Sequence, residues 1–316
     1  MNSKHKFLLI FFILGVLTVT LIKVFEAHSA QLTMLKSAIS HSYKINSDVL
    51  LLRKNEKNFL TRLSWDEIKK FNANAAILEN NLTYLSQLLK EQTELQDELA
   101  HLRNGLKVYQ RDFEVTSQCY ERIGIDFDHG LKGRLKQDYI KIETFIWQLE
   151  TQEFAFRDLL EPYHHQLLKL SYSEKNFLLK PCHKYVDRFK SSLDVFVNLI
   201  DNDMFLDTGH KKLFIQMLTD YAASFYALSD AMLMLDQSPD SPLVALAQSA
   251  RELEFMGRDI SGQIVDRIIS SEKGSRTYST VMMLSFAFGL LSIALVPFLL
   301  LMTSNRPSWV LIDEKV

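Results

Sequence analysis

Apolar residues recur at steps of three and four along most of this chain, which is the spacing of one face of an α-helix. One such run begins at Leu82, Leu85 and Leu89, and a second extends from Ile140 to Leu160. No stretch alternates between apolar and polar residues for long enough to indicate a β-strand. Only 10 glycines and 6 prolines occur in 316 residues, which favours long helices over many short elements. The pattern predicts an all-α protein of about seven helices.

The expected breaks between helices are few. Ser64 is followed by Trp65-Asp66-Glu67, an arrangement typical of a helix N-cap with acidic residues in the first turn. The remaining turns are predicted from glycine, proline and small polar residues. They lie at Gly124–Gly133, Pro181, Asp207–Gly209 and Ser238–Pro242.

The two ends of the chain are the most apolar segments. Residues 7–22 and 281–302 carry no charge, and about 20 apolar residues are needed to cross a bilayer as a helix. We therefore expect transmembrane helices at 7–25 and 277–302. A cleaved signal peptide is the alternative for the first segment, but Ala30 at the cleavage position would place His28 where a small residue is required.

Short basic flanks predict the orientation of these two spans. Lys4 and Lys6 precede the first span, and Arg306 follows the second, so residues 1–6 and the tail 303–316 are expected in the cytoplasm. Residues 26–276 then lie outside. In a bacterium this places a multi-pass protein in the inner membrane, with its central domain in the periplasm.

An internal repeat links two parts of this central segment. Residues 52–71 and 170–189 align without a gap at an offset of 118, and both contain Glu-Lys-Asn-Phe-Leu. The repeat predicts two similar modules, each built on a helical hairpin. We expect its apolar members in the core, and its glutamates in ion pairs and hydrogen bonds across the hairpin. The motif residues are Glu56, Phe59 and Leu60 in the first copy and Glu174, Lys175, Phe177 and Leu178 in the second.

Charge and motifs argue against several classes of function. The net charge is −2, and no basic stripe with interleaved aromatic residues suggests nucleic-acid binding. No nucleotide-binding loop or catalytic-serine motif occurs, so we expect neither an enzyme nor a cofactor. Glu161 and His164 have metal-ligand spacing, but a metal site in a bundle needs further ligands, so none is predicted. Whether Cys119 and Cys182 form a disulfide stays open.

The repeat resembles the helical bimodular sensor domain of bacterial chemoreceptors and sensor histidine kinases. The resemblance rests on the segment from Arg53 to Arg62, on Glu174–Lys180 with Tyr185, Arg188 and Phe189, and on the glycines of Gly124–Gly133. It covers residues 26–276. It implies two stacked helical-bundle modules, often dimeric, that act as a receptor for small organic acids.

Cations suited to such a ligand lie in the first copy and on the last outer helix. Guanidinium groups match carboxylates because two parallel N–H groups face two oxygens. The candidate ligand-binding residues are Arg53, Lys54, Lys57, Arg62, Arg251 and Arg258. In the second copy Ser171-Tyr172 replaces Arg53-Lys54, so that module is expected to bind something else, or nothing.

Full-length members of this family carry a cytoplasmic linker and a signalling domain, whereas 14 residues follow the second predicted span here. The leading hypothesis is a receptor-like protein that senses a small anionic periplasmic ligand. It would signal, in chemotaxis or a two-component system, through a homodimer or a complex with a chemoreceptor or sensor kinase. The alternatives are a non-sensing interaction or scaffold partner of a full-length receptor, and a truncated remnant of a receptor gene.

Overall fold

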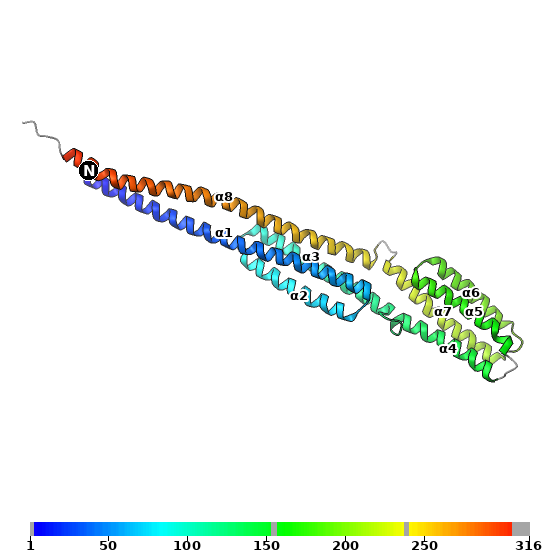
Figure 1. The fold of residues 1–316 in the computed structure, drawn as a ribbon. Coiled ribbons are helices and arrows are strands. Elements are labelled where there is room, and N and C mark those ends of the chain that lie inside the picture. Colours follow the sequence, from blue (N-terminus) through cyan, green and yellow to red (C-terminus); the bar gives the residue numbers. More distant parts are fainter. Residues whose placement is uncertain (1–2, 153–156, 237–239, 305–316) are drawn as a thin grey trace, which may run out of the picture. The chain divides into compact units, whose positions relative to one another are not determined.

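The computed structural model describes residues 3–152, 157–236 and 240–304. Within these ranges it contains eight α-helices and no β-strand (Figure 1). The all-α prediction is confirmed, with one helix more than expected. The helices are α1 (Ser3–Arg62), α2 (Trp65–Leu88), α3 (Thr93–Ile123), α4 (Gly130–Gln152), α5 (Arg157–Leu179), α6 (His183–Asp201), α7 (Thr208–Asp236) and α8 (Pro242–Ser304).

Most helix boundaries lie where the sequence predicts them. The Ser64 hydroxyl accepts a hydrogen bond from the backbone N–H of Asp66 (3.3 Å) at the start of α2. Pro181 lies between α5 and α6, and the carboxylate of Asp207 accepts backbone N–H groups at the start of α7. Of the turn predicted at Ser238–Pro242, residues 238 and 239 lie outside the described part of the chain.

The glycine-rich loop is shorter than predicted, because α4 already begins at Gly130. Gly124 and Gly130 adopt positive φ angles of 113° and 62°, which only glycine adopts at little cost. A Cβ atom at Gly124 would also lie 2.3 Å from the carbonyl oxygen of His129. The loop residues 124–129 therefore make a tight reversal that depends on both glycines.

One break escapes the sequence pattern. The chain turns between α2 and α3 at Leu89–Gln92, where Gln92 N–H donates to the carbonyl of Leu89 (2.8 Å). This turn contains neither glycine nor proline, so the scarcity of those residues does not reveal it. Phe156, which was expected to continue the helical run after Ile140, lies outside the described residues.

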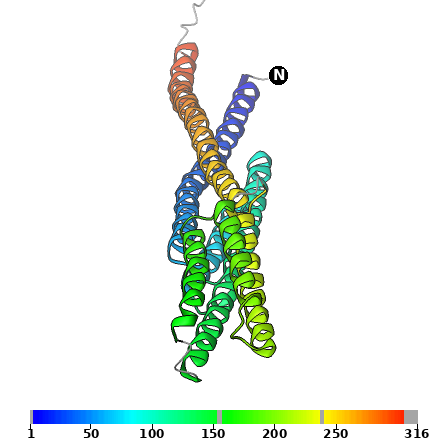
Figure 2. The same cartoon turned by 90° about the vertical axis from the view of Figure 1, so that its right-hand side faces the viewer.

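Helices α4, α5, α6 and α7 pack side by side as a bundle (Figures 1 and 2). Its centre is aromatic as well as aliphatic, and burying each large apolar side chain contributes about 1.5–3 kcal/mol relative to exposure. The most completely buried aromatic residues of this bundle are Tyr163, Phe177, Phe189, Phe196, Phe214, Tyr221 and Phe225.

The chain divides into two compact units. One comprises residues 1–44, 83–98 and 258–316, and the other comprises residues 45–82 and 99–257. Both copies of the repeat belong to the second unit. Among the described residues, no helix combines the length and the apolar character that a membrane crossing needs. Residues 305–316 of the predicted tail lie outside the described part.

Candidate ligand-binding site

Arg53, the first of the predicted ligand-binding cations, is held by two carboxylates of the protein itself. Its Nη1 forms an ion pair with Glu56, and its Nε lies 2.8 Å from Glu254 Oε1 on α8. Burial lowers the pKa of Arg53, but the hydrogen bond and charge of Glu56 outweigh this, so its pKa is raised overall. The guanidinium therefore acts as an internal counterion in this structure.

The other five predicted cations have exposed side chains: Lys54, Lys57, Arg62, Arg251 and Arg258. None of the six predicted cations lines the three pockets, two described below and one near Val24, within the described part of the chain. These five charges lie at the surface, three of them in the first copy of the repeat and two on α8.

The glutamate of the repeat is hydrogen-bonded in both copies, and it is buried in the first copy and half-buried in the second. Tyr109 on α3 donates its hydroxyl to Glu56 Oε2 at 2.5 Å, and Tyr221 on α7 donates to Glu174. The expected hydrogen bond therefore exists, but its partner lies on the third helix of each module and not across the hairpin. Only Glu56 combines it with the expected ion pair, made with Arg53 on its own helix.

The aromatic surroundings of the two glutamates are also equivalent. Phe71 stacks on Phe113 at 3.7 Å between ring centroids, and Phe189 stacks on Phe225 at 4.1 Å. Tyr109 and Phe113 correspond to Tyr221 and Phe225 at an offset of 112. The duplication therefore extends from the hairpin to the next helix, where the sequence alone shows too few identities to reveal it.

The predicted apolar members of the motif lie in the core to different degrees. Phe59 and Phe177 are fully buried, and each packs edge-on against a phenylalanine of the third helix of its module, Phe113 on α3 or Phe225 on α7. Leu60 and Leu178 are half-buried, and Lys175 is exposed. The phenylalanine is thus the residue that anchors each hairpin.

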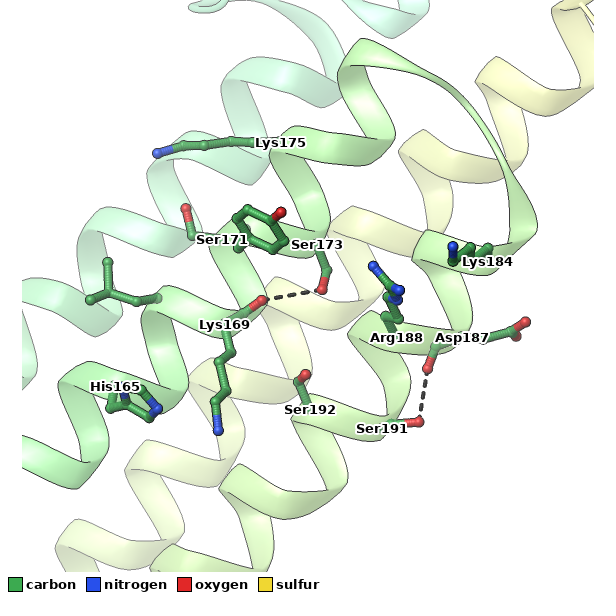
Figure 3. A pocket seen from close by; sticks show the side chains of 12 residues that line it. His165, Lys169, Ser171, Ser173, Lys175, Lys184, Asp187, Arg188, Ser191 and Ser192 are labelled. Atoms are coloured by element: carbon green, nitrogen blue, oxygen red, sulfur yellow. Dashed lines mark hydrogen bonds between the residues drawn. The ribbon is translucent and has the colours of Figure 1, made fainter.

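A concave site lies in the second copy, where α5 and α6 form an open groove of about 1040 Å³ (Figure 3). Four cations and one carboxylate line it, together with four serines and the larger side chains of His165, Leu168 and Tyr172. The charged residues are Lys169 and Lys175 of α5 and Lys184, Asp187 and Arg188 of α6. Among the residues that the structure describes, none of the four cations is in an ion pair.

Arg188 is the best-oriented of these cations. It lies across the groove from Ser173 of α5 (Figure 3), and its guanidinium carbon is 5.9 Å from the centre of the Tyr185 ring, within the range of a cation–π contact. The stacking limits the number of rotamers that the side chain visits. A planar fork held in this way suits a carboxylate better than a mobile lysine does.

The chemistry available here is anion binding. Neither the groove nor the rest of the described chain holds a cluster of three or more potential metal ligands, and His164, noted for its spacing from Glu161, contacts Glu150 at 2.8 Å instead. Cys119 and Cys182 are free thiols. Sequence reasoning missed the groove because its lysines are spread over two helices and look like an ordinary solvated face.

No protein-family model matches the chain, and no curated protein sequence is significantly similar to it. The fold and the groove therefore define an all-α protein with a cationic site on a duplicated hairpin.

Proposed function

We propose that this chain is a membrane-anchored, receptor-like protein that binds a small organic acid and signals through a partner membrane protein. The observation that carries the proposal is the groove between α5 and α6. Four cations against one carboxylate favour an anion there, and Arg188 offers a bidentate contact to a carboxylate. The groove has room for a small ligand, since typical ligand pockets enclose roughly 300–1,000 Å³.

The apolar ends of the chain support membrane anchoring. Residues 7–22 and 281–302 carry no charge. Several of their described side chains are exposed, among them Phe12, Leu17 and Leu284. A long run of exposed apolar side chains at a protein surface marks contact with a membrane or a partner. The predicted spans at 7–25 and 277–302 meet that need, with residues 26–276 in the periplasm of a bacterium.

The resemblance to the helical bimodular sensor domain supports the same reading. In chemoreceptors and sensor kinases, a domain of this kind is implied to act as the receptor for a small organic acid. Our proposal differs in placing the site on the second copy of the repeat, where the cations lack carboxylate partners, and not on the first, where Arg53 is paired with Glu56 and Glu254.

Two continuous helices offer a route for a signal. Helices α1 and α8, of 60 and 63 residues, each extend without a break from the repeat-bearing unit into the apolar ends. A ligand shifts a conformational equilibrium only by its differential affinity for two states. Binding in the groove is proposed to favour one packing of the bundle, which the long helices pass to a partner.

The proposal is tested by titrating the full-length protein, in nanodiscs, with succinate in a calorimeter. We expect saturable binding, and a loss of affinity of at least about tenfold in the Arg188→Ala variant, because a charged hydrogen-bonded contact is removed. Lys190→Ala is the matched control, since Lys190 is an exposed cation of α6 that does not line the groove. It should change affinity by less than about twofold.

The neutral dimethyl ester of succinate distinguishes recognition of an anion from non-specific binding. It should not bind. Equal binding of the ester and the acid, equal losses in the two variants, or no binding of succinate, malate, citrate or acetate would overturn the proposal.

A further inference from the structure

A second, smaller cavity lies between α4 and α5, and its chemistry differs from that of the groove. It encloses about 470 Å³. Part of its wall is aliphatic, and part of it is polar and carries both signs of charge. The aliphatic residues are Leu135, Ile140, Leu178 and Leu228, and the polar ones are Lys132, Lys136, Tyr139, Ser171, Glu174 and Lys175, beside Phe127.

Comparison of the two copies explains why a cavity opens here. At the offset of 118, Ser171 takes the place of Arg53, and Glu174 takes the place of Glu56. In the first copy the guanidinium lies against the buried carboxylate. In the second copy the buried serine side chain is too short to fill that space, so Glu174 lines a cavity in place of contacting a cation.

Glu174 is therefore a half-buried carboxylate without the ion pair that its counterpart Glu56 forms with Arg53. The neutral hydroxyl of Tyr221 donates a hydrogen bond to Glu174. Burial raises the pKa of Glu174 despite that bond and the nearby charge of Lys175. A buried carboxylate without a cation is costly, and a cation brought by a ligand relieves that cost.

Lys132 supplies a charge of the opposite sign in the same cavity. Its side chain is half-buried, and burial lowers the pKa of its amine. Its Nζ lies 5.7 Å from the centre of the Phe127 ring. Lys136, by contrast, forms an ion pair with Asp128, with 2.6 Å between Nζ and Oδ1. Lys132 is thus the better placed cation for a carboxylate inside the cavity.

We propose that this cavity binds a zwitterionic amino acid with an apolar side chain. The ligand's ammonium group would contact Glu174, in the place that the Arg53 guanidinium occupies in the first copy. Its carboxylate would contact Lys132, and its side chain would pack against Leu135 and Leu178. This site is separate in ligand class from the organic-acid groove and does not depend on it, although Ser171 and Lys175 border both.

The test uses the full-length protein in nanodiscs and three probes of one shape. Leucine carries both charged groups, 4-methylpentanoate lacks the amine, and 3-methylbutylamine lacks the carboxylate. We expect leucine to bind and to raise the melting temperature, with each analogue at least about tenfold weaker. Equal binding of leucine and either analogue, or no binding of leucine, valine and phenylalanine, would overturn the proposal.

Variants test the assignment of each charge. Glu174→Gln should weaken leucine by at least about tenfold and leave 4-methylpentanoate unchanged, since the latter never contacts the carboxylate. Lys132→Met should weaken the binding of 4-methylpentanoate and leave the binding of 3-methylbutylamine unchanged. Circular dichroism of each variant verifies folding. A loss of all three probes together in either variant would contradict the assignment.

A graft of the first copy onto the second tests the vacant-counterion argument directly. In α8, Ala250 corresponds to Tyr139 of α4 at an offset of 111 that aligns Leu246 with Leu135 and Glu254 with Glu143. The double variant Ser171→Arg, Tyr139→Ala therefore supplies a guanidinium and the space for it. We expect a higher melting temperature without ligand and no response to leucine.

Arg188→Ala, which affects the organic-acid groove, should keep full leucine binding. This variant distinguishes the two proposals. Loss of succinate binding alone concerns the groove, and loss of leucine binding alone concerns the cavity. If the graft still binds leucine as the wild type does, the cavity is not the site.

Discussion

Glu56 and Glu174 occupy equivalent places in two copies of one hairpin, yet within the described residues only Glu56 forms an ion pair, with Arg53. Both accept a tyrosine hydroxyl from the helix that follows the hairpin, and each copy contains a stacked pair of phenylalanines. Arg53 neutralises Glu56, whereas Ser171 leaves Glu174 facing a cavity. The two copies therefore share the tyrosine hydrogen bond and the stacked phenylalanines. They differ in the ion pair with Arg53, which has no equivalent at Ser171.

The second copy borders a groove and a cavity, and we call it the open copy; the first copy, in which Arg53 is paired, is called the closed copy. In the first copy the cation that suggested a ligand site is bound to protein carboxylates. In the second, the groove and the cavity both lie at positions where the sequence departs from the first.

The shared aromatic core gives the largest expected effect. Phe113→Ala and Phe225→Ala should each lower the free energy of unfolding by about 3–5 kcal/mol, because each removes a fully buried ring and leaves a void. Denaturant unfolding of the full-length protein measures the loss, with the exposed Phe255→Ala as control. A cost below about 1 kcal/mol in one copy alone would break the equivalence of the two cores.

The internal ion pair gives the next largest effect, and here the copies should differ. Arg53→Met leaves Glu56 buried without its counterion and should cost about 3 kcal/mol. Ser171→Ala at the equivalent position should change the free energy of unfolding by less than about 0.5 kcal/mol. Similar small costs at both positions would mean that Arg53 does not stabilise the first copy.

The pH dependence gives the smallest effect. Burial raises the pKa of Glu174 above its ordinary value of 4.5, so the folded chain holds this proton at a pH where the unfolded chain has lost it. Its contribution to the free energy of unfolding is therefore present at low pH and declines as pH rises from about 4.5 through the folded pKa. The difference in melting temperature between wild type and Glu174→Gln, followed with pH, should show that decline. A difference that grows with pH would have the wrong sign.

Much of the fold follows from the sequence, and the site follows less well. Helical spacing predicts the helices, and Ser64, Pro181 and the loop glycines predict most turns. The repeat predicts that Phe59 and Phe177 are core residues. The pairing of Arg53 with Glu254 depends on two helices about 200 positions apart in sequence meeting in space, which no local pattern contains. The groove and the cavity could not be predicted from the sequence for the same reason, since each needs two helices to form its walls.

Hydrogen–deuterium exchange of the full-length protein, with and without succinate and leucine, tests the contrast between the copies most directly. If the second copy is the open one, succinate should protect residues 165–192, and leucine should protect residues 131–140 and 171–178, with no change at residues 49–60. Protection at residues 49–60 instead, around Arg53 and Glu56, would contradict the account.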